Sequence, residues 1–237
     1  MIMRSSTFFG LTLALLGALA LPATTAHAAV STDSLVGYWK FDEGTGTLAA
    51  DSSGHGNNGT LTGGPTWSAS PTNSITFTNP YALSFDGVDD YVGIADADVL
   101  DPGDTFTLSA WVKRGANGVL HPIIDKGIDG YELALNTDNT LALAKNNTAV
   151  IVSSNITITD TLWHHVVATK ATVTSKLYID GTDVTGTVTN QTIGATANAL
   201  TIGRDPGITN FFDGLIDDVR IYNRALAPWE ITELAAG

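Results

Sequence analysis

Short stretches in which every second residue is apolar recur along the chain, and turn residues separate them. The clearest runs from Thr105 to Val112, where apolar residues at even positions alternate with Thr, Ser and Trp at odd ones. This period of two is typical of a half-buried β-strand. Asp-Gly pairs at 86–87, 129–130, 180–181 and 213–214 favour tight hairpin turns between strands. The pattern predicts an all-β fold, a two-sheet antiparallel jelly-roll sandwich.

The composition supports this prediction and argues against several classes of protein. The 24 acidic residues comprise 20 Asp and 4 Glu, beside 24 Gly, and Asp and Gly favour turns over helices. The chain has no cysteine, which excludes disulfides, thiolate metal sites and cysteine nucleophiles. A formal net charge of −13 argues against nucleic-acid binding, which needs a basic surface.

The N-terminal residues have the pattern of a secretory signal peptide. Arg4 precedes an apolar stretch from Phe8 to Leu21, and Ala26-His27-Ala28 offers small residues where a signal peptidase cleaves. The stretch is shorter than the ~20 residues that span a bilayer. We therefore predict cleavage after Ala28, residues 29–237 as one secreted domain, and no membrane insertion of the mature protein.

The remaining strands and one helix are predicted from the same patterns. A short C-terminal helix is expected from Pro228, which suits a first helical turn, with Trp229, Ile231 and Leu234 facing the sheet. Strands are expected at 35–41, 83–85, 91–94, 105–112, 123–125, 131–136, 140–145, 149–153, 163–169, 176–180, 199–202 and 215–222.

Six segments, in order, carry a family resemblance. They read LVGYWKFDEGTGTLAADSSGHGNNGTL from Leu35, LSFDGVDDYVGI from Leu83, FTLSAWVK from Phe106, WHHVVATK from Trp163, KLYIDG from Lys176 and GLIDDVRIYNRALAPWEI from Gly214. Their order and spacing resemble the laminin-G-like jelly-roll family of concanavalin A-like lectins and glucanases, relatives of the pentraxins. The resemblance implies paired first and last strands, binding of a glycan or protein surface, and often a calcium ion. It does not imply one activity, because this fold hosts enzymes and binders.

A calcium site is the first chemical hypothesis. The loop DSSGHGNNGT from Asp51 offers a carboxylate, hydroxyls, amide oxygens and flexible glycines, which suit a hard cation. An ordinary solvated turn uses the same residue types. In LIDDVRIY, Asp217 shares parity with Leu215, Val219 and Ile221, so alternation points it inward, where a carboxylate needs a partner.

If the first and last strands pair, the Asp51 loop and Asp217 can meet. We therefore predict Asp51, Asn57 and Asp217 as calcium ligands. The alternative is that Asp217 accepts backbone N–H bonds or pairs with Arg220 or Arg224. A second acidic group, Asp86, Asp89 and Asp90, lies in a hairpin turn, where solvation is the commoner fate.

The sequence offers little sign of catalysis. Glycanases on this kind of fold carry the spacing ExDxxE, and the four glutamates, Glu43, Glu132, Glu230 and Glu233, do not form it. A serine-nucleophile elbow GxSxG is also missing. The adjacent His164 and His165 point to opposite faces of one strand, so they cannot converge on one metal. We therefore do not expect an enzyme.

Glycan binding requires exposed aromatic faces and polar side chains that bond hydroxyl groups. Trp111 has the parity opposite to the apolar face of its strand, and Tyr131, Arg204 and Asp205 combine the other residue types. We predict these four as ligand-contacting residues of a secreted lectin-like module that binds a glycan or a glycosylated surface. The alternatives are a structural or adhesive protein that binds protein ligands and, less favoured, a polysaccharide lyase or glycanase.

Overall fold

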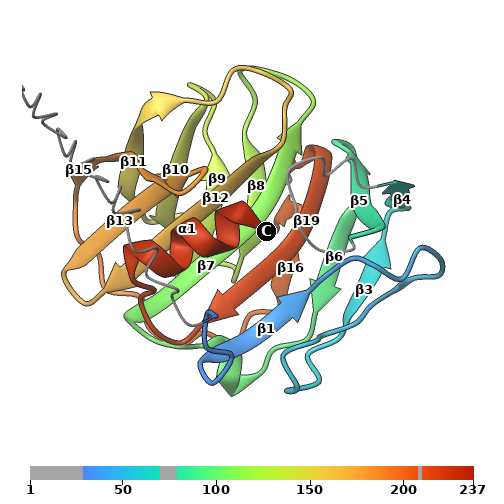
Figure 1. Ribbon diagram of the computed structural model, residues 1–237, viewed down its shortest axis with the longest axis horizontal. Coiled ribbons are helices and arrows are strands. Elements are labelled where there is room, and N and C mark those ends of the chain that lie inside the picture. The colour runs from blue at the N-terminus through green and yellow to red at the C-terminus, as the bar shows by residue number, and fades with distance from the viewer. Residues whose placement is uncertain (1–28, 70–78, 208–209) are drawn as a thin grey trace, which may run out of the picture.

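The computed structural model describes residues 29–69, 79–207 and 210–237. The predicted signal peptide and its cleavage site lie outside the described residues. Two antiparallel β-sheets pack face to face, and the C-terminal helix lies across the outer face of one of them (Figure 1). This arrangement confirms the predicted all-β jelly-roll sandwich with a short C-terminal helix.

The first sheet has eight strands in the order β14-β13-β12-β7-β19-β5-β4, with β1 also paired to β19. Its strands are β1 (Leu35–Trp39), β4 (Thr66–Ala69), β5 (Tyr81–Asp86), β7 (Thr105–Arg114), β12 (His164–Ala171), β13 (Thr174–Ile179), β14 (Thr182–Asp183) and β19 (Asp213–Tyr222). The pairing of β1 with β19 confirms the prediction that the first and last strands are neighbours.

The second sheet has nine strands in the order β15-β11-β10-β9-β8-β16-β6-β3-β2. Its strands are β2 (Leu48–Ala49), β3 (Gly59–Thr62), β6 (Tyr91–Ile94), β8 (His121–Asp125), β9 (Tyr131–Leu135), β10 (Thr140–Lys145), β11 (Ala149–Thr157), β15 (Thr185–Val188) and β16 (Leu200–Ile202). A two-stranded hairpin, β17 (Arg204–Asp205) and β18 (Asn210–Phe211), follows β16, and a 3-10 turn (Asp98–Leu100) precedes β7.

The apolar residues of each strand meet between the sheets because alternation sends every second side chain to that side. Leu108, Ala110 and Val112 of β7 belong to this core, as do Leu133 and Leu135 of β9. Burial of this apolar surface is the main contribution to stability in a chain without disulfides.

The outer face of the eight-stranded sheet has a smaller core of its own under the helix α1 (Pro228–Ala236). Ile231 is fully buried there, against a cluster that includes Val167 and Tyr178. The sequence predicted Trp229 as a residue that faces the sheet, but it is 36% exposed, so Ile231 is the main anchor. The helix is too short to cross a membrane, and no other α-helix occurs among the described residues.

One predicted turn is wrong. Asp213 and Gly214 are the first two residues of β19 and pair with Asp86 and Phe85 of β5. Asp180-Gly181 does form a tight turn, with both residues at positive φ (50° and 76°) between β13 and β14. A dipeptide with high turn propensity thus enters a strand where neighbouring strands supply ladder hydrogen bonds on both sides.

His164 at the start of β12 lies between two aspartates and should make stability depend on pH. Its Nδ1 is 2.7 Å from Asp180 Oδ2 and its Nε2 is 2.9 Å from Asp160 Oδ1. The hydrogen bond to Asp180, helped by Asp160, raises the pKa of His164 to about 9.

Because this pKa lies above the unfolded value of 6.5, the interaction of His164 with the two aspartates stabilises the fold fully below pH ~6.5. This stabilisation is lost as the pH rises through about 9. His164→Gln should therefore cost about 1–2 kcal/mol at pH 6, since the partly exposed aspartates weaken the pair. The difference should vanish near pH 10. Urea unfolding of both proteins at the two pH values measures this, and an equal loss at both would contradict it.

Candidate functional site

Three carboxylates from different elements meet on the outer face of the nine-stranded sheet. Asp125 ends β8 and pairs in register with Glu132 of β9, and Asp205 belongs to β17. Each offers one oxygen atom, and these atoms lie within 4.8 Å of one another. Glu132 points outward because its neighbours Tyr131 and Leu133 face the core. The β17–β18 hairpin covers this part of the sheet, which brings Asp205 over the other two.

These carboxylates, called the Asp125 cluster below, lie in an environment that disfavours negative charge. Asp125 is fully buried and Glu132 is only 9% exposed. Burial, together with repulsion from Asp205, raises the pKa of Asp125 to about 7. Burial, together with repulsion from Asp125 and Asp205, raises the pKa of Glu132 to about 8. Three acids held together out of water require compensation by protons, donors or a cation.

Neutral donors supply part of this compensation. Asn146, just after β10, donates from Nδ2 to Asp125 Oδ2 at 2.5 Å and to Asp205 Oδ1 at 3.2 Å. The backbone N–H groups of Gly127 and Gly207 donate to Asp125 Oδ1 and Asp205 Oδ1. Asn146 Oδ1 and Glu132 Oε1 are buried and have no hydrogen-bond partner among the residues that the structure describes. Within that part of the chain, these two buried oxygens remain available for a ligand.

A pocket of about 420 Å³ borders the Asp125 cluster. It is lined by Tyr91, Gly93, Ile94, Ala95, Gly127, Ile128, Asn198, Ala199, Thr201, Arg204, Pro206 and Gly207. Gly127 and Gly207 belong to this lining and also bond the cluster, so the two sites share a wall. The volume is within the usual range for small-molecule sites.

Gly127 shapes this shared wall and cannot be replaced without strain. Its φ of 76° is left-handed, and a Cβ there would lie 2.6 Å from the Asn198 side chain. Asn198 in turn donates to the carbonyl of Ile128. The close approach of the β8–β9 turn to the segment before β16 thus depends on a glycine.

Arg204 packs against two aromatic rings at the pocket. The guanidinium carbon of Arg204 lies 4.8 Å from the Tyr91 ring centroid and 5.6 Å from that of Phe211. Its Nε is buried and has no hydrogen-bond partner among the described residues. Stacking on the rings fixes the plane of the guanidinium, while its N–H donors remain available to a bound molecule.

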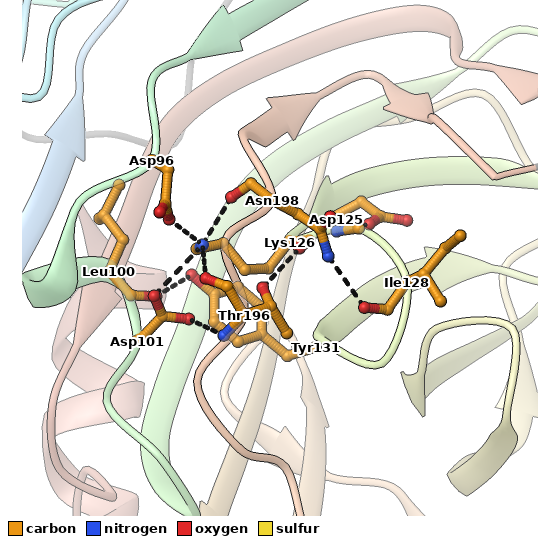
Figure 2. A network of polar contacts seen from close by, with 10 residues as sticks. Asp96, Leu100, Asp101, Asp125, Lys126, Ile128, Tyr131, Thr196 and Asn198 are labelled. Carbon is orange, nitrogen blue, oxygen red and sulfur yellow. Dashed lines mark hydrogen bonds and ion pairs between the residues drawn. The ribbon is translucent and has the colours of Figure 1, made fainter.

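Lys126 directly follows Asp125 at the end of β8, and its side chain makes a separate set of polar contacts (Figure 2). Its side chain is fully buried, and its ammonium lies 2.6 Å from Asp96 Oδ1 and 3.3 Å from Asp101 Oδ2. The carbonyl oxygens of Thr196 and Asn198 accept from it as well. Asp125 points away from this ammonium (Figure 2). Lys126 is therefore the counter-ion of Asp96 and Asp101 and not of Asp125.

Of the four residues predicted from sequence to contact a ligand, two lie at the site. Arg204 lines the pocket and Asp205 belongs to the Asp125 cluster. Trp111 does have the outward parity, but it is only 6% exposed and packs against His165 with ring centroids 5.3 Å apart. Tyr131 is 1% exposed and belongs to the core, where its hydroxyl donates to the Leu100 carbonyl. Neither ring presents a face to a ligand.

Asp51 and Asn57, predicted as calcium ligands, come together in the loop after β2. The Asp51 carboxylate accepts from the backbone N–H groups of Tyr38, Ser53 and Asn57 and from the Ser53 hydroxyl. Despite partial burial, these hydrogen bonds lower the pKa of Asp51. Asn57 donates to the Val36 carbonyl and accepts from Trp39 Nε1. The carboxylate thus closes the loop on β1, and calcium binding there stays a prediction.

Asp217 is buried, as predicted, but on the opposite face of the sheet from the one predicted. Ile216 belongs to the core between the sheets, so Asp217 faces outward, and a bulge at Asp218 (φ 48°) restores inward parity for Val219. Asn79 Nδ2 donates to Asp217 Oδ2 at 2.7 Å. Burial, with repulsion from Asp218, raises the pKa of Asp217 to about 8.

The other acidic group of the sequence, Asp86, Asp89 and Asp90, does assemble in the β5–β6 turn. Asp86 and Asp89 are exposed, and Asp90 accepts from the Asp86 N–H group at 2.9 Å. The carboxylates of Asp86 and Asp90 therefore accept hydrogen bonds within the turn itself.

Sequence reasoning missed Asp125, Glu132 and Asn146. The sequence did contain a signal that Glu132 faces away from the core, because the apolar residues Tyr131, Leu133 and Leu135 occupy the alternate positions of this strand and lie in the core. No sequence signal indicated that the β17–β18 hairpin folds over Asp125 and Glu132, since Asp205 follows them in the chain by 80 and 73 residues.

Comparison with known proteins agrees with this fold. Domain 4 of the extracellular arabinanase AbnA from Geobacillus stearothermophilus, solved with arabinotriose, superposes with a TM-score of 0.67 at 20% identity, over 85% of this chain and 98% of that one. The binding domain of Paraclostridial Mosquitocidal Protein 1 gives 0.66 at 17% identity, over 86% of this chain and 52% of that one.

In two longer proteins, this chain matches only a part of their length. Trypanosoma rangeli sialidase, solved with sialic acid, gives a TM-score of 0.64 at 21% identity, over 88% of this chain and 34% of that one. Adhesion G-protein coupled receptor V1 of Danio rerio is 27% identical in an alignment of 143 residues that covers 54% of this chain and 2% of the receptor.

A family profile decides the assignment. Residues 86–232, more than half of the chain, match the profile of the concanavalin A-like lectin/glucanases superfamily, laminin-G type. The matched segment includes both the Asp125 cluster and the whole pocket lining. The chain belongs to this superfamily.

Proposed function

We propose that this chain is a carbohydrate-binding domain and that an oligosaccharide occupies the pocket beside the β17–β18 hairpin. The observation that carries the proposal is the fixed Arg204 guanidinium between Tyr91 and Phe211, at a pocket of about 420 Å³. Sugar hydroxyls need donors and acceptors in fixed positions, and the apolar C–H faces of a sugar ring need flat or apolar surface.

The pocket supplies both kinds of contact. Arg204, Asn198 and Thr201 bring polar groups, while Tyr91, Ile128 and Pro206 bring apolar surface. Thr201 donates to the Arg204 carbonyl at 2.7 Å, which anchors the hairpin to β16. The polar groups are thus held by the framework before a ligand arrives, which lowers the entropic cost of binding.

The relatives support a carbohydrate ligand. The arabinanase domain, which this chain matches over nearly the whole length of that domain, was solved with arabinotriose. The sialidase was solved with sialic acid. We further propose that the protein is secreted, on the signal-peptide pattern of residues 1–28, and that it recognises a glycan or a glycosylated surface.

Oligosaccharide binding can be measured directly, with arabinotriose and sialyl-lactose as first probes before a wider glycan array. Arg204→Met should weaken the Kd of a bound sugar at least ~10-fold, because charged hydrogen bonds contribute about 1.5–3 kcal/mol. Lys176→Met, the same kind of change at an exposed position on the other sheet, should leave binding unchanged.

Two outcomes would count against this function. Binding that survives Arg204→Met would place the sugar elsewhere on the domain. A complete lack of sugar binding across the array, together with saturable binding to a glycan-free protein surface, would favour the alternative of a protein-binding adhesive domain.

A further inference from the structure

A second pocket, of about 390 Å³, lies on the outer face of the eight-stranded sheet. Arg220 of β19 faces outward there, because its neighbours Val219 and Ile221 belong to the core. Tyr38 of β1 pairs in register with Arg220 and lines the same space, which is called the Tyr38 pocket below. This pocket shares no lining residue with the one beside the β17–β18 hairpin. The two are therefore separate candidates for a ligand.

Two cationic side chains and no carboxylate line the Tyr38 pocket. Arg220 comes from β19, and Lys40 directly follows β1. Such a lining is unexpected in a chain that has 24 acidic and 11 basic residues. The pocket beside the β5–β6 turn, by contrast, is lined by Asp86 and Asp213. The lining of the Tyr38 pocket therefore favours an anionic ligand, although the chain as a whole is acidic.

The Arg220 guanidinium is held in place by the protein itself. Its carbon lies 4.3 Å from the centroid of the Tyr38 ring, and only 9% of the residue is exposed. Its Nη2 donates to the Tyr38 hydroxyl at 2.7 Å and to Asp218 Oδ1 at 3.1 Å. Its Nε makes no hydrogen bond within the described part of the chain. A fixed guanidinium with a spare donor suits a carboxylate or a sulfate group.

Lys40 supplies a second positive charge at the rim of the pocket. Its side chain is exposed, and its ammonium lies 5.4 Å from the centroid of the Tyr38 ring, within the range of a cation–π contact. Lys126, Lys170 and Lys176 each form an ion pair with an aspartate. Lys40 has no carboxylate within ion-pair distance among the residues that the structure describes. Its charge is therefore available to a bound anion.

Acidic residues close to the pocket are already engaged. Asp218 accepts from the Tyr38 hydroxyl at 2.6 Å and from Arg220. Asp51, which precedes the lining residue Ser52, accepts four hydrogen bonds from its own loop and from β1. Protein donors thus occupy these carboxylates, whereas the two cations face the pocket.

We infer that the Tyr38 pocket binds an acidic sugar that carries one carboxylate or sulfate group, with this group against Lys40 and Arg220. The hydroxyls of Thr32 and Ser52 supply contacts for sugar hydroxyl groups, and Leu234 of α1 supplies apolar surface for the ring. A nucleic acid or another long polyanion suits the site less, because outside the pocket it would meet a chain with a net charge of −13. The inference does not depend on the pocket beside the β17–β18 hairpin.

Two matched pairs of sugars test the inference in NMR titrations of the isotope-labelled protein. They are glucuronate against glucose, and sulfated N-acetylglucosamine against N-acetylglucosamine. In at least one pair the charged sugar should bind ~10-fold more tightly, because charge-assisted hydrogen bonds are about twice as strong as neutral ones. The backbone amide signals of Tyr38, Ser53 and Arg220 should shift with the charged sugar. The preference should shrink at high salt, which screens the charges.

Lys40→Glu is the decisive variant, because it reverses a charge at an exposed position where the fold tolerates the change. It should weaken binding of the charged sugar at least ~10-fold and leave that of the neutral sugar unchanged. Lys40→Arg keeps the charge and should keep the preference. Lys113→Glu is the matched control: Lys113 of β7 lies outside the pocket lining, so its reversal should leave binding unchanged.

Three results would overturn the inference. The first is a set of shifts at Tyr38 and Ser53 that are equal for the charged and neutral sugars of both pairs. The second is a Lys40→Glu variant that binds the charged sugar as tightly as the wild type. The third is the absence of any shift at these amides with ~50 mM charged sugar, far above a millimolar Kd.

The outcome can be separated from that of the proposed function. Arg204→Met removes the cation of the other pocket and should leave the shifts at Tyr38 unchanged, whereas Lys40→Glu should not affect a sugar that binds beside the β17–β18 hairpin. Charge-dependent shifts at Tyr38 in a protein whose hairpin pocket binds nothing would leave this second site standing.

Discussion

Replacing Lys126 with methionine should lower the free energy of unfolding by about 3–5 kcal/mol, because it leaves two carboxylates without their buried counter-ion. The Lys126 ammonium is fully enclosed by Asp96, Asp101 and the carbonyls of Thr196 and Asn198. Methionine fills nearly the same space, so the loss measures the charge and its hydrogen bonds. Urea unfolding at pH 7 gives the value.

Lys145→Met is the matched control. Its ion pair with Asp129 is longer, 3.6 Å, and Asp129 is largely exposed, so a loss below about 1 kcal/mol is expected. Neutralising an acid in the Lys126 background, as in Lys126→Met with Asp101→Asn, should recover part of the stability. A Lys126→Met loss as small as that of the control would mean that the acids take protons or water at little cost.

Asp51→Ala should cost about 2–4 kcal/mol, the second large effect. One carboxylate accepts three backbone N–H groups and one hydroxyl, and the Tyr38 N–H belongs to strand β1. Truncation leaves these donors unsatisfied where water reaches them poorly, and each such donor costs about 1–3 kcal/mol. Asp89→Ala, at an exposed turn, should change stability by less than about 0.5 kcal/mol.

The same variant distinguishes the two roles of Asp51. If its carboxylate acts through loop hydrogen bonds, the loss is equal in calcium and in chelator. A loss that appears only with calcium present would instead favour the ligand role predicted from the sequence. Denaturant unfolding of Asp51→Ala and wild type in both buffers makes the comparison.

Much of the fold could be predicted because alternation and turn chemistry are local properties. The strands around Leu108 and Leu133, the pairing of the first and last strands and the helix at Pro228 were all confirmed. The errors arise where tertiary structure overrides a local rule. A bulge at Asp218 reverses the parity on which the inward direction of Asp217 depended.

The candidate site was only half predictable for the same reason. Arg204 and Asp205 were identified by residue type, but their partners Tyr91, Asp125 and Glu132 come from strands that only the folded sheet brings beside them. Conversely, the aromatic residues Trp111 and Tyr131 were favoured by chemistry and excluded by burial. Residue type suggests what a site can bind, while exposure decides which candidates take part.

If the pocket binds a glycan as proposed, the β17–β18 hairpin is the segment through which such a domain would change its ligand. It has only two paired positions and lies on the outside of the sandwich, yet it carries Arg204, Asp205 and Phe211. Exchanging residues 204–211 would alter the guanidinium, its aromatic support and one carboxylate together, without touching the residues between the sheets. On the proposed function, this short segment would set the specificity of the pocket, and a designer would change it to give the same framework a new binding preference.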